Sequence, residues 1–186
     1  MEHEFDGDPL ALDDYRRYVR DKVDAGRSEV FLNRNVEHSA IIVEALIMVA
    51  RERVEILTGS LNKEIYGDPS VVHAIGSFLD RTWAPAFSVP TLYILVEDES
   101  RLRGHPFLAQ ASDAFSSGQA ELRRVRDAAK DSYPVHFTVT DGRHYRCKTS
   151  RGLPEAVVQF NAPETGEKFQ SIFENIRAQS DIIAPP

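Results

Sequence analysis

Short apolar runs of strand length alternate with longer amphipathic segments, and this alternation constrains the fold more than any other feature of the sequence. Residues 54–60 (VEILTGS) and 91–99 (TLYILVEDE) are rich in apolar and β-branched side chains and have the length of buried strands. Between and before them, segments 34–53 and 68–81 carry apolar residues at helical spacing. Strands that alternate with helices are typical of an α/β sheet with crossover connections.

Residue types at the ends of these segments support the helical assignments. Asn35 and Asp68 are candidate N-caps, and Pro69 suits the first helical position. Residues 10–25 form a further amphipathic pattern that ends at Gly26, a usual residue just past a helix. The pattern of segment 105–128 predicts one or two short helices around Gly118.

The C-terminal third adds an antiparallel part to the predicted sheet. Residues 135–141 and 144–150 alternate in polarity around Asp141-Gly142-Arg143, and an Asp-Gly pair in this setting is typical of a hairpin. A strand over 155–161 and a helix over 163–180 follow. We therefore predict an α/β fold with a mixed, mainly parallel sheet and helices on both faces. Residues 1–27 are expected to form an acidic segment and helix, and 28–183 the α/β domain.

Composition narrows the classes of partner. The formal net charge of −7 does not favour nucleic acid as a partner, although segment 120–130 is locally basic. One cysteine, Cys147, excludes an internal disulfide and a multi-cysteine zinc site, which fits a reducing cytoplasm. The acidic N-terminus lacks the pattern of a signal peptide, and the longest apolar run, 40–50, is too short to cross a bilayer. We expect a cytoplasmic protein without a membrane anchor.

Polar residues occur at the ends of the first three predicted strands, which are a short strand over 28–33 and the strands over 54–60 and 91–99, and ligands of open α/β sheets usually bind there. The candidates for an anion site are Asn33, Arg34 and Asn35 after the first strand and Ser60 after the second. The simpler interpretation is that such residues cap helices wherever strands end. No metal-binding or phosphate-loop motif is present in the sequence, so neither a metal nor a cofactor is expected.

The order of elements over about residues 28–180, together with VHFTVTDGRHYR, resembles the phospholipase D superfamily. Members of that family carry an H-x-K-x-x-x-x-D motif, in which the histidine attacks a phosphodiester and the lysine binds the phosphate. With Asp141 at the motif aspartate, His136 falls at the lysine and Pro134 at the nucleophile. A shift of two residues makes His136 the nucleophile but puts Thr138 at the lysine and Gly-Arg at the aspartate. Either alignment implies a degenerate motif.

This resemblance implies a non-catalytic domain that acts as a dimeric interaction or regulatory module, with a protein partner in a larger bacterial assembly. A homodimer is implied because two motif copies meet in the family and this chain has room for one. The strand that carries His136 should then lie near the dimer axis.

Two alternatives remain open. The first is a metal-independent phosphodiesterase or nuclease in which His136 and Asp141 are catalytic and Arg146 replaces the lysine. The simpler interpretation of Arg146 is a surface ion pair with Asp141 across the turn. The second is a nucleic-acid binder that uses the basic segment, with Arg123, Arg124, Arg126 and Lys130.

Overall fold

The computed structural model describes residues 11–26, 28–81, 89–133 and 135–186. Its centre is an eight-stranded sheet with the order β1-β7-β6-β5-β2-β3-β4-β8. The strands are β1 (Phe31–Asn33), β2 (Arg53–Thr58), β3 (Thr91–Val96), β4 (Ala120–Val125), β5 (Phe137–Thr140), β6 (His144–Lys148), β7 (Ala156–Gln159) and β8 (Ser180–Ile182).

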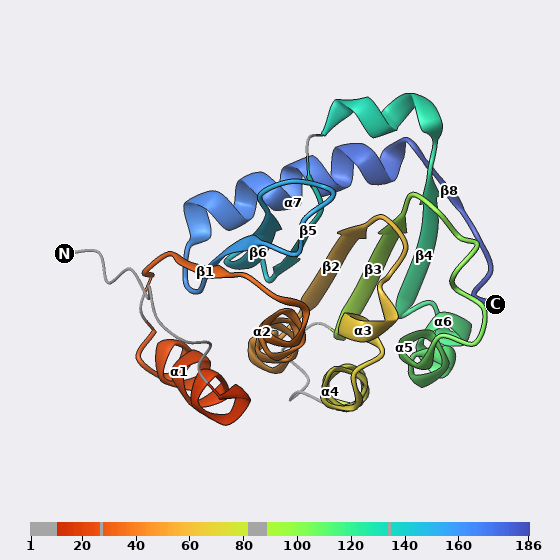
Figure 1. The fold of residues 1–186 in the computed structure, drawn as a ribbon. Helices are drawn as coiled ribbons and strands as arrows, with labels where there is room; N and C mark the ends of the chain where they lie inside the picture. Colours follow the sequence, from red (N-terminus) through yellow and green to blue (C-terminus); the bar gives the residue numbers. More distant parts are fainter. Residues whose placement is uncertain (1–10, 27, 82–88, 134) are drawn as a thin grey trace.

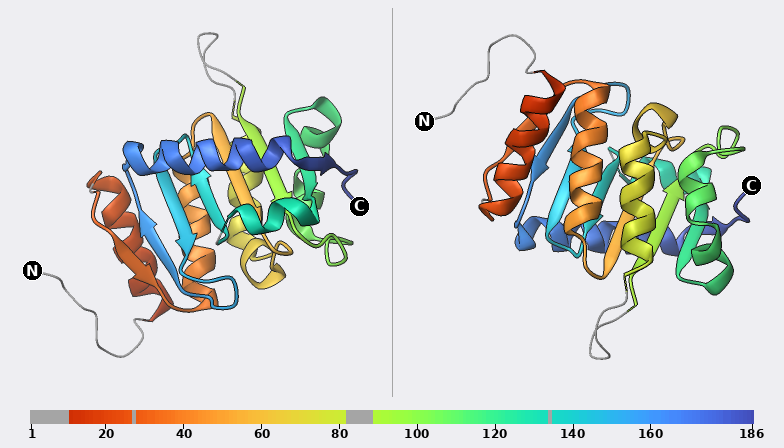
Figure 2. Two further views of the ribbon diagram at one scale, coloured as in Figure 1. Left: turned by 90° about the horizontal axis from the view of Figure 1, so that it is seen from above. Right: turned by 90° about the horizontal axis from the view of Figure 1, so that it is seen from below.

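Helices cover both faces of this sheet (Figure 1). The long helix α7 (Pro163–Ala178) crosses one face, and the 3₁₀ helix η1 (Asp127–Ser132) lies on the same side (Figures 1 and 2). The other helices lie on the opposite face. They are α1 (Leu12–Asp24), α2 (Val36–Val49), α3 (Lys63–Tyr66), α4 (Pro69–Leu79), α5 (Pro106–Gln110) and α6 (Ser112–Ser117).

The mixed α/β architecture with helices on both faces is confirmed, but the sheet is less parallel than predicted. Within the described chain, only the β2–β3 and β3–β4 pairs are parallel, and the other neighbouring strands are antiparallel. The difference arises because strands β5, β6 and β7 follow one another through short connections, which can join only antiparallel neighbours.

Two strands were not predicted. Residues 120–125 were placed in a helical segment, yet they form β4 beside β3, with Ala120, Leu122 and Val125 buried. Segment 180–182 forms β8 and pairs with β4. In β4 the period-two pattern is short and includes two arginines, so the sequence signal is weak, and pairing with β3 decides the conformation.

The predicted caps and hairpin are present. Oδ1 of Asn35 accepts a hydrogen bond from the backbone N–H of His38 at 2.7 Å, and Oδ1 of Asp68 accepts one from that of Ser70 at 2.8 Å. The Asp-Gly turn joins β5 to β6, with positive φ at both Asp141 (52°) and Gly142 (61°).

Helix α1 packs on its own chain. Tyr15 and Val19 share a hydrophobic cluster with residues of α2 and with Phe31 of β1. The Tyr15 ring stacks on the ring of His38 with centroids 3.7 Å apart. No helix of the described residues has the length and hydropathy needed to cross a membrane.

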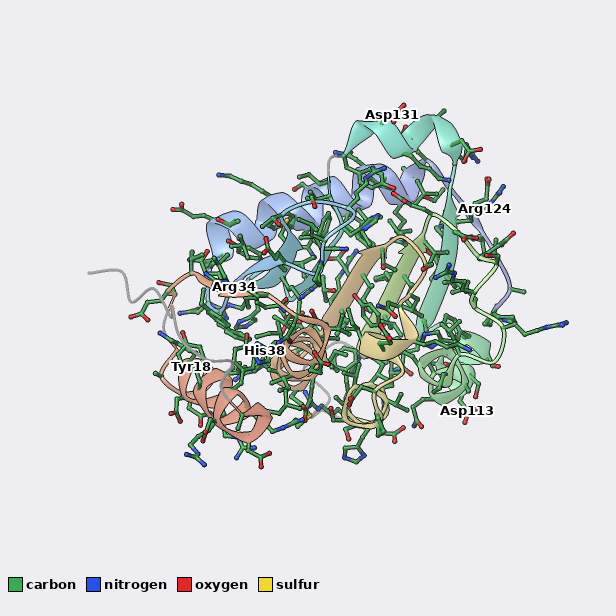
Figure 3. The ribbon with its side chains drawn as sticks, in the orientation of Figure 1. Tyr18, Arg34, His38, Asp113, Arg124 and Asp131 are labelled. Carbon is green, nitrogen blue, oxygen red and sulfur yellow. The ribbon has the colours of Figure 1, made fainter. Side chains whose placement is uncertain are left out.

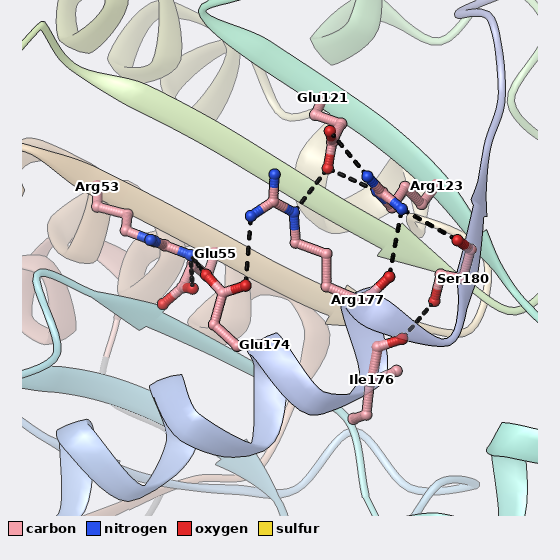
Figure 4. A network of polar contacts seen from close by, with 8 residues as sticks. All are labelled: Arg53, Glu55, Glu121, Arg123, Glu174, Ile176, Arg177 and Ser180. Carbon is pink, nitrogen blue, oxygen red and sulfur yellow. Dashed lines mark hydrogen bonds and ion pairs between the residues drawn. The ribbon is translucent and has the colours of Figure 1, made fainter.

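A network of ion pairs and hydrogen bonds between charged side chains links α7 to strands β2 and β4 of the sheet (Figure 4). Arg177 on α7 bonds Glu121 of β4 at 2.7 Å and Glu174 at 3.3 Å. Glu174 also pairs with Arg53 at the start of β2. Nη2 of Arg53 lies 2.6 Å from Oε1 of Glu55, but off the direction of a good hydrogen bond. Glu55 is therefore a fully buried carboxyl group with one close cation.

We expect the unfolding free energy to depend on pH through Glu55. Burial raises its pKa from 4.5 to about 7, an effect that Arg53 and Arg177 oppose and Glu174 reinforces. Between those two pH values the folded state holds this proton and the unfolded state has lost it. The contribution of Glu55 to stability therefore falls as pH rises from 4.5 to 7, by up to about 3 kcal/mol, and is constant above that range.

The Glu55→Gln variant tests this, because glutamine keeps the shape and does not titrate. Its stability relative to wild type should increase between pH 5 and pH 7, measured by urea unfolding at each pH. The Glu99→Gln variant, at an exposed position in the loop after β3, should leave the slope unchanged. A constant difference between Glu55→Gln and wild type would contradict the expectation.

Candidate functional site

The candidate site lies at the sheet edge where the parallel strands end. β5 runs antiparallel to β2, so His136, which directly precedes β5, lies at the edge reached by the ends of β2 and β3. Gly59 follows β2 and packs against the His136 ring, and a Cβ atom on Gly59 would lie 3.3 Å from Cε1. This contact leaves little room for a side chain at position 59.

A carboxylate from the end of β3 faces His136. Oε1 of Glu97 lies 3.1 Å from Nε2 of His136, although off the line of the N–H bond. The hydroxyl of Tyr133 donates to the same oxygen at 2.9 Å, and Nη1 of Arg151 lies 3.5 Å away. Nε2 of His136 is thus buried against a carboxylate that has further partners.

The protonation states follow from this environment. Burial lowers the pKa of His136, and the neighbouring Glu97 opposes that effect without cancelling it. Burial alone would raise the pKa of Glu97, but His136, Tyr133 and Arg151 together outweigh it and lower the pKa. At neutral pH the arrangement is a neutral imidazole beside an ionised carboxylate.

A second cluster surrounds Arg146 on β6, whose side chain is 4% exposed. Its Nε donates to Oδ1 of Asn33 at 2.9 Å, and its Nη2 donates to Oγ of Ser39 at 2.9 Å and to the Pro154 carbonyl at 3.0 Å. Among the described residues no carboxylate lies within 4 Å of the guanidinium. Arg146 is therefore a buried cation held by neutral acceptors, and it joins β6 to β1 and α2.

Lys148 lies across the hairpin from His136. The backbone N–H of Lys148 donates to the His136 carbonyl at 2.9 Å, and Thr138 pairs with Arg146 two residues further along. Since side chains of a strand alternate between faces, these four lie on one face as two cross-strand pairs. Burial and the neighbouring Arg146 both lower the pKa of Lys148. The two cross-strand pairs therefore place two cations, Arg146 and Lys148, on the same face as the His136 imidazole.

The predicted anion-site residues are brought together only in part. Asn33 and Arg146 are bonded to each other, and the Asn35 carbonyl accepts from Asn33 at 2.8 Å. Arg34 is exposed beside the start of α2 and outside this cluster (Figure 3). Ser60 lies in the loop after β2, one residue beyond the glycine that contacts His136.

Asp141 lies at the opposite end of β5 from His136, so the predicted convergence of His136, Asp141 and Arg146 does not occur. The strand between His136 and Asp141 separates them by roughly 15 Å. Oδ1 and Oδ2 of Asp141 accept hydrogen bonds from the backbone N–H groups of residues 51, 52 and 53, at 2.8, 3.0 and 2.8 Å. The alternative surface pair of Asp141 with Arg146 is absent as well, since no ion pair joins these two described residues.

Sequence reasoning missed Lys148, Tyr133 and Arg151 as members of the site. The position of Lys148 was available in principle, because counting outward from the Asp-Gly turn pairs it with His136. The other two come from loops, for which no periodicity predicts a contact. Pro134, at the motif position of the nucleophile, lies outside the described residues.

The other histidines of the described chain are not placed as partners of His136. Nε2 of His105 donates to the Leu61 carbonyl at 2.7 Å, while its Nδ1 accepts from the backbone of Phe107. His144, at the far end of β6, accepts at Nδ1 from the backbone of Asn161. His38 and His73 lie on α2 and α4, and His73 is exposed. No cluster of three or more metal-ligating side chains occurs in the described part of the chain.

The predicted basic segment is largely neutralised in the fold. Arg123 pairs with Glu121, Arg126 with Asp181 and Lys130 with Asp127. Arg124 is exposed on β4 (Figure 3). These pairs reduce the positive potential that a nucleic-acid backbone would require.

Comparison with known proteins gives a family match and a set of structural neighbours. Residues 35–183 match the family described as "Domain of unknown function (DUF7931)". No curated protein matches the chain.

The structural neighbours include a phospholipase D family member. Nuc from Salmonella typhimurium, a phospholipase D family member, aligns with a TM-score of 0.57 at 16% identity, over 84% of this chain and 99% of its own. NucT from Helicobacter pylori aligns at 0.54 and 12% identity, over 84% and 99%. TrmBL2, an archaeal chromatin protein, aligns at 0.62 and 12% identity, over 92% and 68%. The fold is therefore phospholipase D-like.

Proposed function

The chain belongs to the DUF7931 family of domains of unknown function, and we propose that its phospholipase D-like fold serves as a non-catalytic, dimeric interaction or regulatory module. In this proposal the motif is degenerate: Asp141 keeps the aspartate position, while His136 and Pro134 replace the lysine and the nucleophile. In this proposal the sheet edge at His136 keeps its shape and charge but lacks the nucleophile that would attack phosphorus.

One observation supports the loss of catalysis above the others. Nε2 of His136 is buried and faces Glu97 at 3.1 Å. Attack on a phosphodiester needs an imidazole nitrogen whose lone pair reaches the substrate. Nε2, turned into the protein against a carboxylate, could take that role only after a rearrangement of the strand end.

The alternative, a metal-independent phosphodiesterase or nuclease, draws on a different observation. Lys148 lies across from His136, and although its amine donates to the Arg151 carbonyl at 2.9 Å, the ammonium group has two further N–H donors that could hold a phosphate as the motif lysine does in the family. Arg146, the earlier candidate for this role, is less suitable because Asn33, Ser39 and Pro154 already occupy its Nε and Nη2.

An activity assay tests the proposal. We expect no turnover of bis(p-nitrophenyl) phosphate or single-stranded DNA in the presence of EDTA, for wild type and for His136→Ala alike. The physical reason is the missing nucleophile, whose loss costs many orders of magnitude in rate. Wild-type turnover that disappears in His136→Ala would reject the non-catalytic proposal in favour of the alternative.

The dimer is a separate part of the proposal. It rests on the resemblance to a family in which two motif copies meet, whereas this chain holds one. A protein partner would bind the resulting assembly. Sedimentation of the purified chain should give twice the monomer mass of 20.9 kDa, and a mass of one chain would remove the dimer while leaving the fold unaffected.

A further inference from the structure

We infer that the chain binds a small polyphosphorylated molecule in a hollow next to the candidate site. This hollow has a volume of about 400 Å³ and lies between the loop that follows β2 and the loop that follows β3. Its polar lining consists of Ser60, Asn62, Lys63, Ser100, Arg101 and Arg103. The inference goes beyond the proposed function and does not depend on it.

The charge of the lining points to an anion. Lys63, Arg101 and Arg103 are all exposed cations, and none has a carboxylate within 4 Å among the described residues. The acidic residues next to the lining in sequence are Glu64 and Glu99, neither of which lines the hollow, and Asp98 uses Oδ1 to accept from the backbone of Ser100 at 2.9 Å. The lining thus holds three cations and no carboxylate, which favours an anion although the net charge of the chain is −7.

Buried contacts hold the two loops in place. Nε2 of His105 donates to the Leu61 carbonyl at 2.7 Å and thereby ties the second loop to the first. The backbone N–H of Asp98 donates to the Gly59 carbonyl at 2.8 Å. The amine of Lys63 lies 3.4 Å from the Arg103 carbonyl, so it bridges the hollow. A site fixed before binding loses less entropy when a ligand enters.

Backbone strain marks the same place. Leu61 lies at the base of the hollow with φ of 52°, although it is neither glycine nor asparagine, and its side chain is buried in the core. Such a conformation costs of order 1–3 kcal/mol and is concentrated at functional sites. Its neighbours Ser60 and Asn62 both belong to the lining, and Oδ1 of Asn62 accepts from the backbone N–H of Glu64 at 3.0 Å.

The lining also defines the class of ligand. Three cations and two hydroxyls suit two or three linked phosphate groups, which exceed the charge of one orthophosphate. No aromatic side chain lines the hollow, so it offers no platform on which bases of a single-stranded nucleic acid could stack. A volume of about 400 Å³ lies within the range of small-molecule sites.

Titration calorimetry with the full chain tests the inference, using tripolyphosphate, ATP, adenosine and orthophosphate as separate probes. We expect tripolyphosphate and ATP to bind with similar affinity, orthophosphate to bind at least about tenfold more weakly, and adenosine not to bind. The Arg101→Gln/Arg103→Gln double variant should weaken tripolyphosphate binding by about tenfold or more, and added salt should weaken it in wild type.

The matched control is Arg20→Gln, which removes an exposed cation of α1 far from the hollow and should leave binding unchanged. All replaced side chains are exposed, so circular dichroism should show intact folding in each variant. The inference is overturned if tripolyphosphate fails to bind at millimolar concentration, or if the double variant binds it as well as wild type. Equal losses in Arg20→Gln would also overturn it, because they would mean unspecific attraction.

Discussion

Replacement of Gly166 by alanine is expected to destabilise the protein by about 3 kcal/mol, although alanine favours helices. Gly166 lies in the first turns of α7, where the helix packs on the Asp-Gly turn between β5 and β6. A Cβ atom there would lie 2.5 Å from the backbone nitrogen of Arg143 and closer still to the carbonyl oxygen of Gly142. Both neighbours are backbone atoms and cannot move aside as a flexible side chain would.

Two effects of opposite sign therefore compete at Gly166. Helix propensity would stabilise the alanine variant by about 1 kcal/mol, whereas the overlap forces α7 away from the sheet it covers. We expect the overlap to prevail, with a fall in melting temperature of about 10 °C. Gly152→Ala is the matched control, because a Cβ atom there meets nothing within 4 Å. A Gly166→Ala variant as stable as Gly152→Ala would contradict the packing described.

Replacement of Asp141 by alanine is expected to cost about 3 kcal/mol of unfolding free energy as well. The carboxylate accepts hydrogen bonds from three successive backbone N–H groups at the start of β2, those of residues 51, 52 and 53. In the alanine variant, two of these N–H groups are exposed and can hydrogen-bond to water, but the third is partly buried and would lose its acceptor. Alanine also disfavours the positive φ of 52° at this position.

The control for Asp141 is asparagine, which tolerates positive φ and keeps one acceptor oxygen. Asp141→Asn should therefore lose less stability than Asp141→Ala in urea unfolding. If the aspartate supported a reaction at the other end of β5, its replacement would alter activity and leave stability unchanged. That outcome would contradict the structural role. Both variants alter the contacts of one turn, so their effects should not add with those of Gly166→Ala.

The sequence carried enough information for the order and type of most elements. Asn35, Asp68 and the Asp-Gly turn each determine a local conformation through their own hydrogen bonds or φ angles, so their roles could be predicted without tertiary context. The segment that forms β4 lacked such a local signal. Its conformation depends on pairing with β3 and β8, which lie far away in the chain.

The candidate site was predictable only where alternation along a strand determines it. The period of two places Thr138 and Arg146 on one face of the β5–β6 pair, and the predicted anion-site residue Asn33 is a partner of Arg146. By contrast, motif spacing does not show that Asp141 lies one strand length away from His136. Glu97 was not among the predicted site residues, since its contact with His136 joins residues 39 positions apart.

The availability of the His136 imidazole is the most direct test of the non-catalytic account. Diethyl pyrocarbonate reacts with accessible, unprotonated imidazole nitrogens, and peptide mass spectrometry after brief exposure of the native protein reports each histidine separately. Because Nε2 of His136 is buried against Glu97, His136 should react much more slowly than His73, which is exposed on α4. Modification of His136 as fast as that of His73 would mean that a free nucleophilic nitrogen exists at this edge, and the non-catalytic account would be wrong.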